Sequence, residues 1–145
     1  SSRARYRCRY RYDTPPERTG VMYFDFEKLD VYQVALDFAL SADDVAQKLP
    51  RGRRYLKDQL LRAASSIAAN IAEGVGEYSP AENARFYRIA RRSAVECASH
   101  LLVSARLGLI QDDALLGRGR DQLLRNVAML TSLTKSVSAK NPHAR

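Results

Sequence analysis

The sequence predicts an all-α protein, an antiparallel up-down-up-down four-helix bundle with a basic N-terminal tail. Apolar residues recur every three or four positions in four stretches of about twenty residues or more, which is the spacing of one helix face. The connections between these stretches are short, and short connections favour antiparallel neighbours. From Met22 onward no stretch alternates apolar and polar residues as a half-buried strand would. We therefore divide the chain into a basic N-terminal arm or leader at residues 1–21, a four-helix bundle at residues 22–140 and a C-terminal tail at residues 141–145.

The arm at residues 1–21 has no helical period and ends in a stretch broken by Pro15, Pro16 and Gly20. It holds six Arg, and three Tyr lie among them. Arg and Tyr side chains can contact phosphates and stack on bases, so one interpretation is a nucleic-acid-binding arm. The alternative, which we favour, is a translated leader, because Met22 would make a natural start for the bundle.

The first predicted helix runs from about Phe26 to Leu49 and ends at Pro50. The second runs from about Arg54 to Glu73, and Gly74 is expected to act as its C-cap. Each helix has an apolar seam along one face. The seam positions are Val31, Ala35, Phe38, Ala42, Val45 and Leu49 in the first helix and Leu56, Leu60, Ala63, Ile67 and Ile71 in the second.

The third helix has the clearest start signal. Ser79 is a predicted N-cap whose hydroxyl bonds the first turn, Pro80 occupies the first helical position, and Glu82 completes a capping box. The helix is expected to end near Gly108. Its predicted seam consists of Tyr87, Ala90, Ala94, Cys97, Leu101 and Ala105.

The fourth helix is expected to begin at a cap formed by Asp112 or Asp113. Gly117 and Gly119 weaken its first turns, so the sequence allows for a break there and a restart near Arg120. Its predicted seam consists of Leu116, Leu123, Val127, Leu130 and Val137.

Composition narrows the class of protein. Apolar residues make up 46% of the chain and charged residues 28%, the balance of a soluble globular domain. No apolar stretch approaches the roughly 18 residues of a membrane span, and no hydrophobic segment follows the basic start as in a secretory signal. Two cysteines cannot form a disulfide framework, so we expect a cytoplasmic protein. The net charge of +8 favours a polyanionic partner.

The second helix carries a family resemblance. Residues 59–74 read QLLRAASSIAANIAEG, which resembles the Q-L-x-R-A-x-x-S-I-x-x-N-I-A-E-G signature of the 23S rRNA intervening sequence proteins, also called the four-helix bundle protein family. Phe86-Tyr87-Arg88-Ile89-Ala90 in the third helix is also similar to the family, whereas Arg92 stands where the family often has Gly. The signature positions are Gln59, Arg62, Ser66, Asn70, Glu73 and Gly74.

The resemblance implies a bacterial cytoplasmic protein whose bundle assembles into a ring-like homopentamer. It also implies a link to nucleic acid, since genes of this family lie within intervening sequences of 23S rRNA genes. A related branch, the accessory variability determinant proteins of diversity-generating retroelements, binds nucleic acid and a reverse transcriptase. The family implies no enzymatic activity and no cofactor.

The chemistry of the signature favours structural roles. Its many Ala residues let a neighbouring helix approach closely. Ser65, Ser66 and Asn70 place polar groups among apolar ones, which predicts an interhelical hydrogen-bond network if they are buried. Glu73 lies at the C-terminal end of the helix, where the helix dipole disfavours an acid, so we expect a compensating Arg or backbone N–H group.

The third helix offers the best candidate nucleic-acid surface. At about 100° per residue, Arg85, Arg88 and Arg92 cluster on one side with Arg91 nearby. Such a ridge could contact phosphates without sequence preference. The alternative is a solvated helix face paired internally with Glu82 and Glu96. A second basic group, at the turn between the first two helices, consists of Arg51, Arg53, Arg54 and Lys57, and a third, weaker group of Arg118, Arg120 and Arg125.

Catalytic and metal sites find little support in the sequence. Glu96 and His100 could share a metal, but helical di-metal bundles use two such pairs and the sequence has no second one. Cys97 lies on the apolar seam and is expected to be a core residue. We predict no catalytic residue and no metal ligand.

Apolar residues outside the seams suggest assembly, although a wider buried stripe within one bundle would explain them equally. These are Leu61, Ile89, Leu102, Leu107 and Leu133. The function we predict is a non-enzymatic homo-oligomer that binds RNA or DNA through basic surfaces with little sequence specificity. The alternative is a protein-interaction adaptor that docks a partner such as a reverse transcriptase or ribosomal factor.

Overall fold

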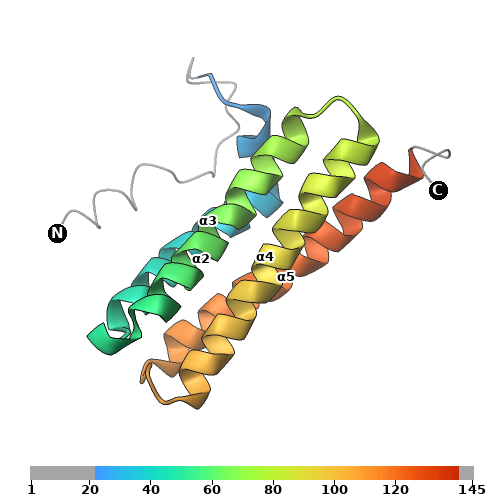
Figure 1. The fold of residues 1–145 in the computed structure, drawn as a ribbon. Coiled ribbons are helices and arrows are strands. Elements are labelled where there is room, and N and C mark those ends of the chain that lie inside the picture. Colours follow the sequence, from blue (N-terminus) through green and yellow to red (C-terminus); the bar gives the residue numbers. More distant parts are fainter. Residues whose placement is uncertain (1–21, 141–145) are drawn as a thin grey trace.

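A computed structural model describes residues 22–140, so the predicted arm at residues 1–21 and the predicted tail at residues 141–145 lie outside the described residues. Four helices make up this part of the chain, α2 (Asp30–Lys48), α3 (Arg54–Gly76), α4 (Pro80–Arg106) and α5 (Asp113–Ala139) (Figure 1). Two short 3₁₀ turns, η2 (Asp25–Lys28) and η3 (Arg51–Arg53), precede α2 and α3.

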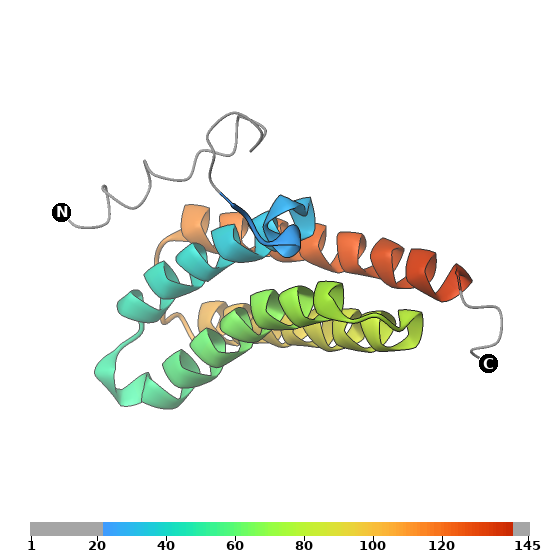
Figure 2. The ribbon, with the colours of Figure 1, turned by 90° about the horizontal axis from the view of Figure 1, so that it is seen from above.

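The helices form the predicted up-down bundle. Each helix contacts the next along the chain, and α5 closes the bundle against α2. Seen from above, α2 and α5 form one layer and α3 and α4 the other (Figure 2). The backbones of α2 and α4 do not approach each other closely in the described chain, so these two helices lie on a diagonal.

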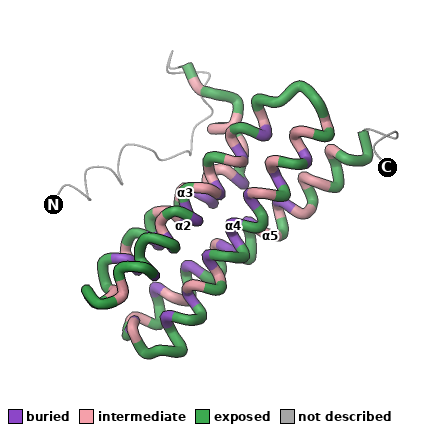
Figure 3. Tube along the Cα trace, in the orientation of Figure 1, coloured by how far each residue is buried: buried purple, intermediate pink, exposed green. Residues whose placement is uncertain are grey.

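The predicted seams supply most of the core (Figure 3). Every seam position of the second helix is buried, and so are those of the first except Leu49, which is half-buried. In α4 the seam is buried as far as Leu101, but Ala105 is exposed, contrary to the prediction. The apolar period alone therefore located the core faces of α2, α3 and most of α4.

The first helix begins later than predicted. Phe26 belongs to η2, and the extended residue Leu29 (φ −84°, ψ 129°) separates this turn from α2. The Gln33 side chain donates a hydrogen bond of 2.7 Å to the Glu27 carbonyl, so a side chain satisfies that backbone group. The Phe26 ring packs on Tyr32 with centroids 4.8 Å apart, which holds η2 against α2.

Gly74 is not the C-cap of α3, because the helix continues to Gly76. Gly74 is buried, and a Cβ atom there would lie 2.6 Å from Cε1 of Tyr87 on α4. Glycine is needed at this position so that the Tyr87 ring can approach the α3 backbone. The glycine that does end a helix is Gly108, with φ 66°, where the N–H groups of Gly108 and Leu109 donate to carbonyls of the last turn of α4.

The start of α4 is at the predicted position, but its capping differs. Ser79 is the N-cap residue, yet its side chain makes no capping hydrogen bond, and Glu82 pairs with Arg85 instead of turning back to Ser79. Asn83 stabilises the connection, because its side-chain amide donates to the carbonyls of Gly74 and Glu77. Side-chain bonds from within α4 thus hold the α3–α4 loop.

Helix α5 is continuous, without the break at Gly117 and Gly119 that the sequence allowed for. Asp112 is the N-cap, and its Oδ1 accepts a 3.0 Å bond from the Leu115 N–H. Gly119 is buried, and a Cβ atom added there would lie 3.2 Å from Leu101 on α4 and 3.6 Å from Phe38 on α2. Packing against two neighbouring helices outweighs the low helix propensity of glycine at this position.

The core face of α5 is also rotated from the predicted seam. Leu115, Gly119 and Asn126 are buried, whereas the predicted seam positions Leu116 and Val127 are only half-buried. Asn126 is fully buried, and neither its Oδ1 nor its Nδ2 has a hydrogen-bond partner in the described part of the chain. A search for apolar periodicity overlooks these positions, because one of them has no side chain and another is polar.

Candidate nucleic-acid interface

The predicted basic ridge lies on the surface of α4. Arg85, Arg88, Arg91 and Arg92 are all exposed, while Ala90, Ser93 and Ala94 between and beside them are buried. We call these four arginines the α4 arginine stripe. The burial pattern confirms that they lie outside the core face of the helix.

Two members of the stripe are engaged locally. Arg85 pairs with Glu82 at 2.9 Å, and its guanidinium lies 4.6 Å from the ring centroid of Phe86. Arg91 turns toward α5, where its Nε donates a 3.0 Å hydrogen bond to Thr131 Oγ1. That hydroxyl in turn donates to the Val127 carbonyl at 2.7 Å. Arg91 therefore connects the stripe to α5, which its position on one helix could not reveal.

The other two members of the stripe, Arg88 and Arg92, have no local partner among the described residues. Within residues 22–140 neither guanidinium forms an ion pair. The predicted internal pairing of the stripe occurs at Glu82 but not at Glu96, whose Oε1 lies 3.4 Å from His100 Nε2. Two exposed guanidinium groups one turn apart are thus available to a polyanion.

The second basic group does not join the stripe. Arg51 and Arg53 lie in η3, and Arg54 and Lys57 lie in the first turn of α3. Arg54 is the first residue of α3, whereas Arg85 lies in the second turn of α4, which starts beside the other end of α3. At about 1.5 Å of rise per residue, the two arginines are about 25 Å apart along the bundle. Two of the four have local partners, since Arg53 Nη1 lies 3.4 Å from the Tyr55 hydroxyl and Arg54 Nε lies 3.7 Å from an oxygen of Asp58.

The signature residues of α3 divide into two kinds. Apart from the buried Gly74, Ser66 and Asn70 are half-buried and hydrogen-bonded, while Gln59, Arg62 and Glu73 are exposed. Among the described residues Glu73 has no ion pair or hydrogen bond, so the expected compensating group is not found. Water can solvate this carboxylate, which removes the need for a protein partner.

One interhelical hydrogen bond of the predicted network is present. The hydroxyls of Ser66 on α3 and Ser93 on α4 lie 3.0 Å apart. Asn70 contributes within its own helix, because its Nδ2 donates to the Ser66 carbonyl at 2.8 Å and to the Ser66 hydroxyl at 3.0 Å. Ser65 is exposed and bonds back to the carbonyl of Leu61. The network therefore fixes the α3–α4 register through a single serine pair.

Two buried titratable groups of α4 have raised pKa values. Burial raises the pKa of the Cys97 thiol to about 12, and the neighbouring Glu96 carboxylate acts in the same direction. Burial also raises the pKa of Tyr87. No three His, Cys, Asp or Glu side chains between residues 22 and 140 gather as metal ligands would. Over the same residues, no helix has the length and apolar character needed to span a bilayer.

Sequence comparison decides the family. A family profile described as 23S rRNA-intervening sequence protein matches residues 27–131, which include all of α2, α3 and α4 and most of α5. The chain belongs to this family. The family match thus covers the α4 arginine stripe as well as the α3 signature. No curated protein matches the sequence.

A solved structure shares the fold of the family. It is the crystal structure of a protein of unknown function from the S23 ribosomal protein family of Bacteroides thetaiotaomicron VPI-5482. The TM-score is 0.65 at 24% sequence identity, and the match covers 72% of this chain and 98% of the other. This likeness supports the four-helix architecture.

Proposed function

We propose that this protein is a non-enzymatic, self-associating nucleic-acid-binding protein that contacts phosphates through the α4 arginine stripe. The observation that carries the proposal is the exposure of Arg88 and Arg92 without an ion-pair partner in the described structure. Phosphate contacts by arginine supply affinity that is largely independent of base sequence. We therefore expect RNA or DNA to bind with little sequence preference.

Self-association is the second part of the proposal. Of the apolar residues outside the predicted seams, Leu102 and Leu107 are 58% and 50% exposed, while Leu61, Ile89 and Leu133 are half-buried. Large apolar side chains that a single chain exposes are candidates for burial in an assembly. The family resemblance implies five copies, and repetition of the stripe around an assembly would multiply the phosphate contacts of each copy.

The binding test uses the full 145-residue chain. Fluorescence anisotropy with a labelled structured RNA and a labelled DNA duplex, over a series of salt concentrations, gives the dependence of log K on log salt. The wild-type affinity is expected to fall steeply with salt. In Arg88→Ala/Arg92→Ala the slope should become shallower by about two if one copy binds, since each phosphate contact contributes about one.

A matched control separates the stripe from the general charge of the protein. Arg118→Ala/Arg125→Ala removes the same charge from exposed positions of α5 and is expected to weaken binding less. A third variant, with the six arginines of residues 1–21 replaced by serine, tests the arm. If this variant loses all binding while Arg88→Ala/Arg92→Ala keeps the wild-type slope, the bundle has no part in nucleic-acid binding.

That outcome would favour the second candidate function, a protein-interaction adaptor. The exposed apolar residues of α4 and α5 support this candidate, because depletion of charge and exposure of large apolar side chains mark the centres of protein interfaces. Equal affinity for RNA and for heparin would also favour it.

A further inference from the structure

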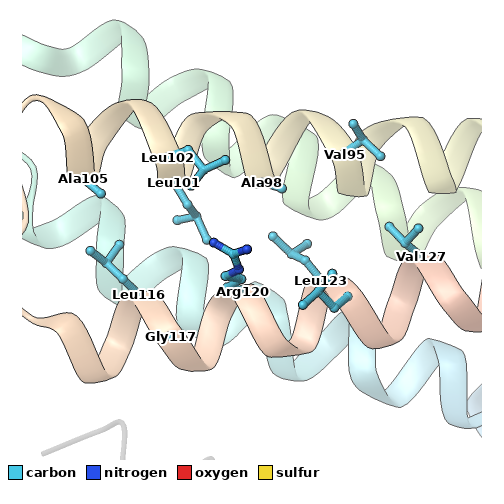
Figure 4. Close-up of a pocket in the computed structure, with 11 residues that line it drawn as sticks. Val95, Ala98, Leu101, Leu102, Ala105, Leu116, Gly117, Arg120, Leu123 and Val127 are labelled. Carbon is cyan, nitrogen blue, oxygen red and sulfur yellow. The ribbon is translucent and has the colours of Figure 1, made fainter.

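An apolar groove lies between the C-terminal half of α4 and the N-terminal half of α5 (Figure 4). Its volume is ≈ 390 Å³. Val95 and Leu102 line it from α4, and Leu116 and Leu124 line it from α5. Leu102 is 58% exposed and Leu124 59% exposed. The apolar lining of the groove is therefore in contact with solvent when the chain is alone. Such a surface favours a protein partner.

Arg120 is the one charged side chain among the residues that line this groove. It extends from α5 toward α4 and lies between Leu101 and Leu123 (Figure 4). Its guanidinium forms no ion pair with any residue between 22 and 140. The groove thus combines an apolar lining with one positive charge. It would fit a partner surface on which an Asp or Glu side chain lies next to a large apolar side chain.

The outer face of α2 offers that combination. Leu40 is 59% exposed. Asp37 lies three residues earlier, which places it beside Leu40 on the helix surface, and it too is exposed without an ion pair in the described chain. Helix α2 contains four Asp and one Lys, so it is the acidic helix of the bundle. We call Asp37 and Leu40 the α2 ridge.

We propose that the α2 ridge of a second copy of this chain docks in the α4–α5 groove, with Leu40 against Leu102 and Leu124 and the Asp37 carboxylate paired with Arg120. The inference rests on the proposed self-association and specifies its two surfaces. The ridge lies on α2 and the groove between α4 and α5, so different helices form the two surfaces. The contact is therefore heterologous, each copy offering a ridge to one neighbour and a groove to another, and such contacts build rings or chains.

The test measures mass in solution by light scattering coupled to size exclusion, with the full chain. The groove variant is Leu102→Glu/Leu124→Glu, and the ridge variant is Leu40→Lys. Each is expected to be monomeric, because one of its two contact surfaces is blocked. The groove variant keeps an intact ridge, and the ridge variant keeps an intact groove. When the two variants are mixed in equal amounts, they should therefore form a 1:1 heterodimer. Tyr55→Glu, at a 56% exposed residue of α3, is the control and should keep the wild-type mass.

A charge reversal tests the pairing without altering the apolar surface. Arg120→Glu and Asp37→Arg are each expected to raise the concentration at which the assembly dissociates by about tenfold. The double variant Arg120→Glu/Asp37→Arg should recover wild-type assembly, because every contact then joins the same two opposite charges with their positions exchanged.

The outcomes distinguish the interface from the self-association itself. A monomeric wild-type protein overturns the proposed self-association and this inference with it. A wild-type oligomer whose mass the groove variant retains overturns the interface alone. Two monomeric variants that form no heterodimer on mixing, while both keep a helical circular dichroism spectrum, overturn the heterologous pairing.

Discussion

At the scale of single residues, glycines show how one residue type serves different physical needs. Gly108 supplies the left-handed backbone, φ 66°, that ends α4. Gly74 has no such conformation and instead leaves room for Tyr87, whose Cε1 would lie 2.6 Å from an added Cβ. Gly117 has neither constraint, since nothing lies within 4 Å of a Cβ placed there.

This contrast predicts opposite effects of the same substitution. Gly74→Ala gains helix propensity but forces the buried Tyr87 ring to move, and we expect it to lower the free energy of unfolding by about 1–3 kcal/mol. Gly117→Ala gains the propensity without a clash and should raise that free energy by about 0.5–1 kcal/mol. Urea unfolding followed by circular dichroism measures both. Stabilisation by Gly74→Ala would show that the Tyr87 contact does not constrain the helix.

At the scale of helices, α5 differs from the other three. Its core face contains the fully buried Asn126, whose amide atoms lack partners in the described structure. A buried amide without hydrogen bonds costs about 1–3 kcal/mol of desolvation. Gly119, on the same face, allows α5 to lie close to Leu101 of α4 and Phe38 of α2.

We predict that Asn126→Leu raises the free energy of unfolding by about 1–3 kcal/mol, because a side chain of similar length replaces the unsatisfied amide. Asn126→Ala is the control, and it should gain less since it leaves a cavity. Differential scanning calorimetry compares the three proteins. A lower melting temperature for Asn126→Leu than for wild type would mean that the amide is hydrogen-bonded in solution.

At the scale of the whole molecule, charge is separated between diagonal helices. Helix α4 has five Arg and two Glu, a net charge of +3, whereas α2 has four Asp and one Lys, a net charge of −3. In the bundle α2 packs on α3 and α5 and not on α4, so the most acidic and the most basic helix are not neighbours. This separation of charge is consistent with the two proposals made above, a contact between chains through α2 and phosphate binding through the α4 arginine stripe.

The bundle as a whole also protects Cys97. Its thiol keeps its proton to a pH of about 12 in the folded protein, whereas the reference pKa is 9.0. In Cys8→Ser, where Cys97 is the remaining cysteine, we expect reaction with Ellman's reagent at pH 8 to require unfolding. The stability contributed by the neutral thiol is present below about pH 9 and is lost as pH rises toward 12. The urea midpoint of Cys8→Ser should therefore fall more between pH 8 and pH 10 than that of Cys8→Ser/Cys97→Ala. Rapid labelling of the native protein at pH 8 would contradict the buried position.

The α4 arginine stripe shows where sequence reasoning about the candidate site was sufficient and where it was not. The helical angle alone placed Arg85, Arg88 and Arg92 away from the core, because side-chain direction on a helix follows residue number. The ion-pair and hydrogen-bond partners of the arginines could not be predicted from the helical angle. Glu96 was a candidate ion-pair partner for the stripe, but its carboxylate lies beside His100. Arg91 instead donates a hydrogen bond to Thr131 on α5, forty residues later in the sequence.

The sequence by itself determined that the described chain is a four-helix bundle. It also determined which residues form the core faces of α2 and α3, and where α4 begins. These features could be predicted because helical periodicity and helix-start signals depend on residues only a few positions apart. Tertiary structure alone decided that α3 passes through Gly74, that α5 passes through Gly117 and Gly119, and that Asn126 is buried. It also decided which residues line the α4–α5 groove. These features depend on the distance between side chains of different helices, such as Tyr87 above Gly74, and no local pattern along the chain encodes that distance.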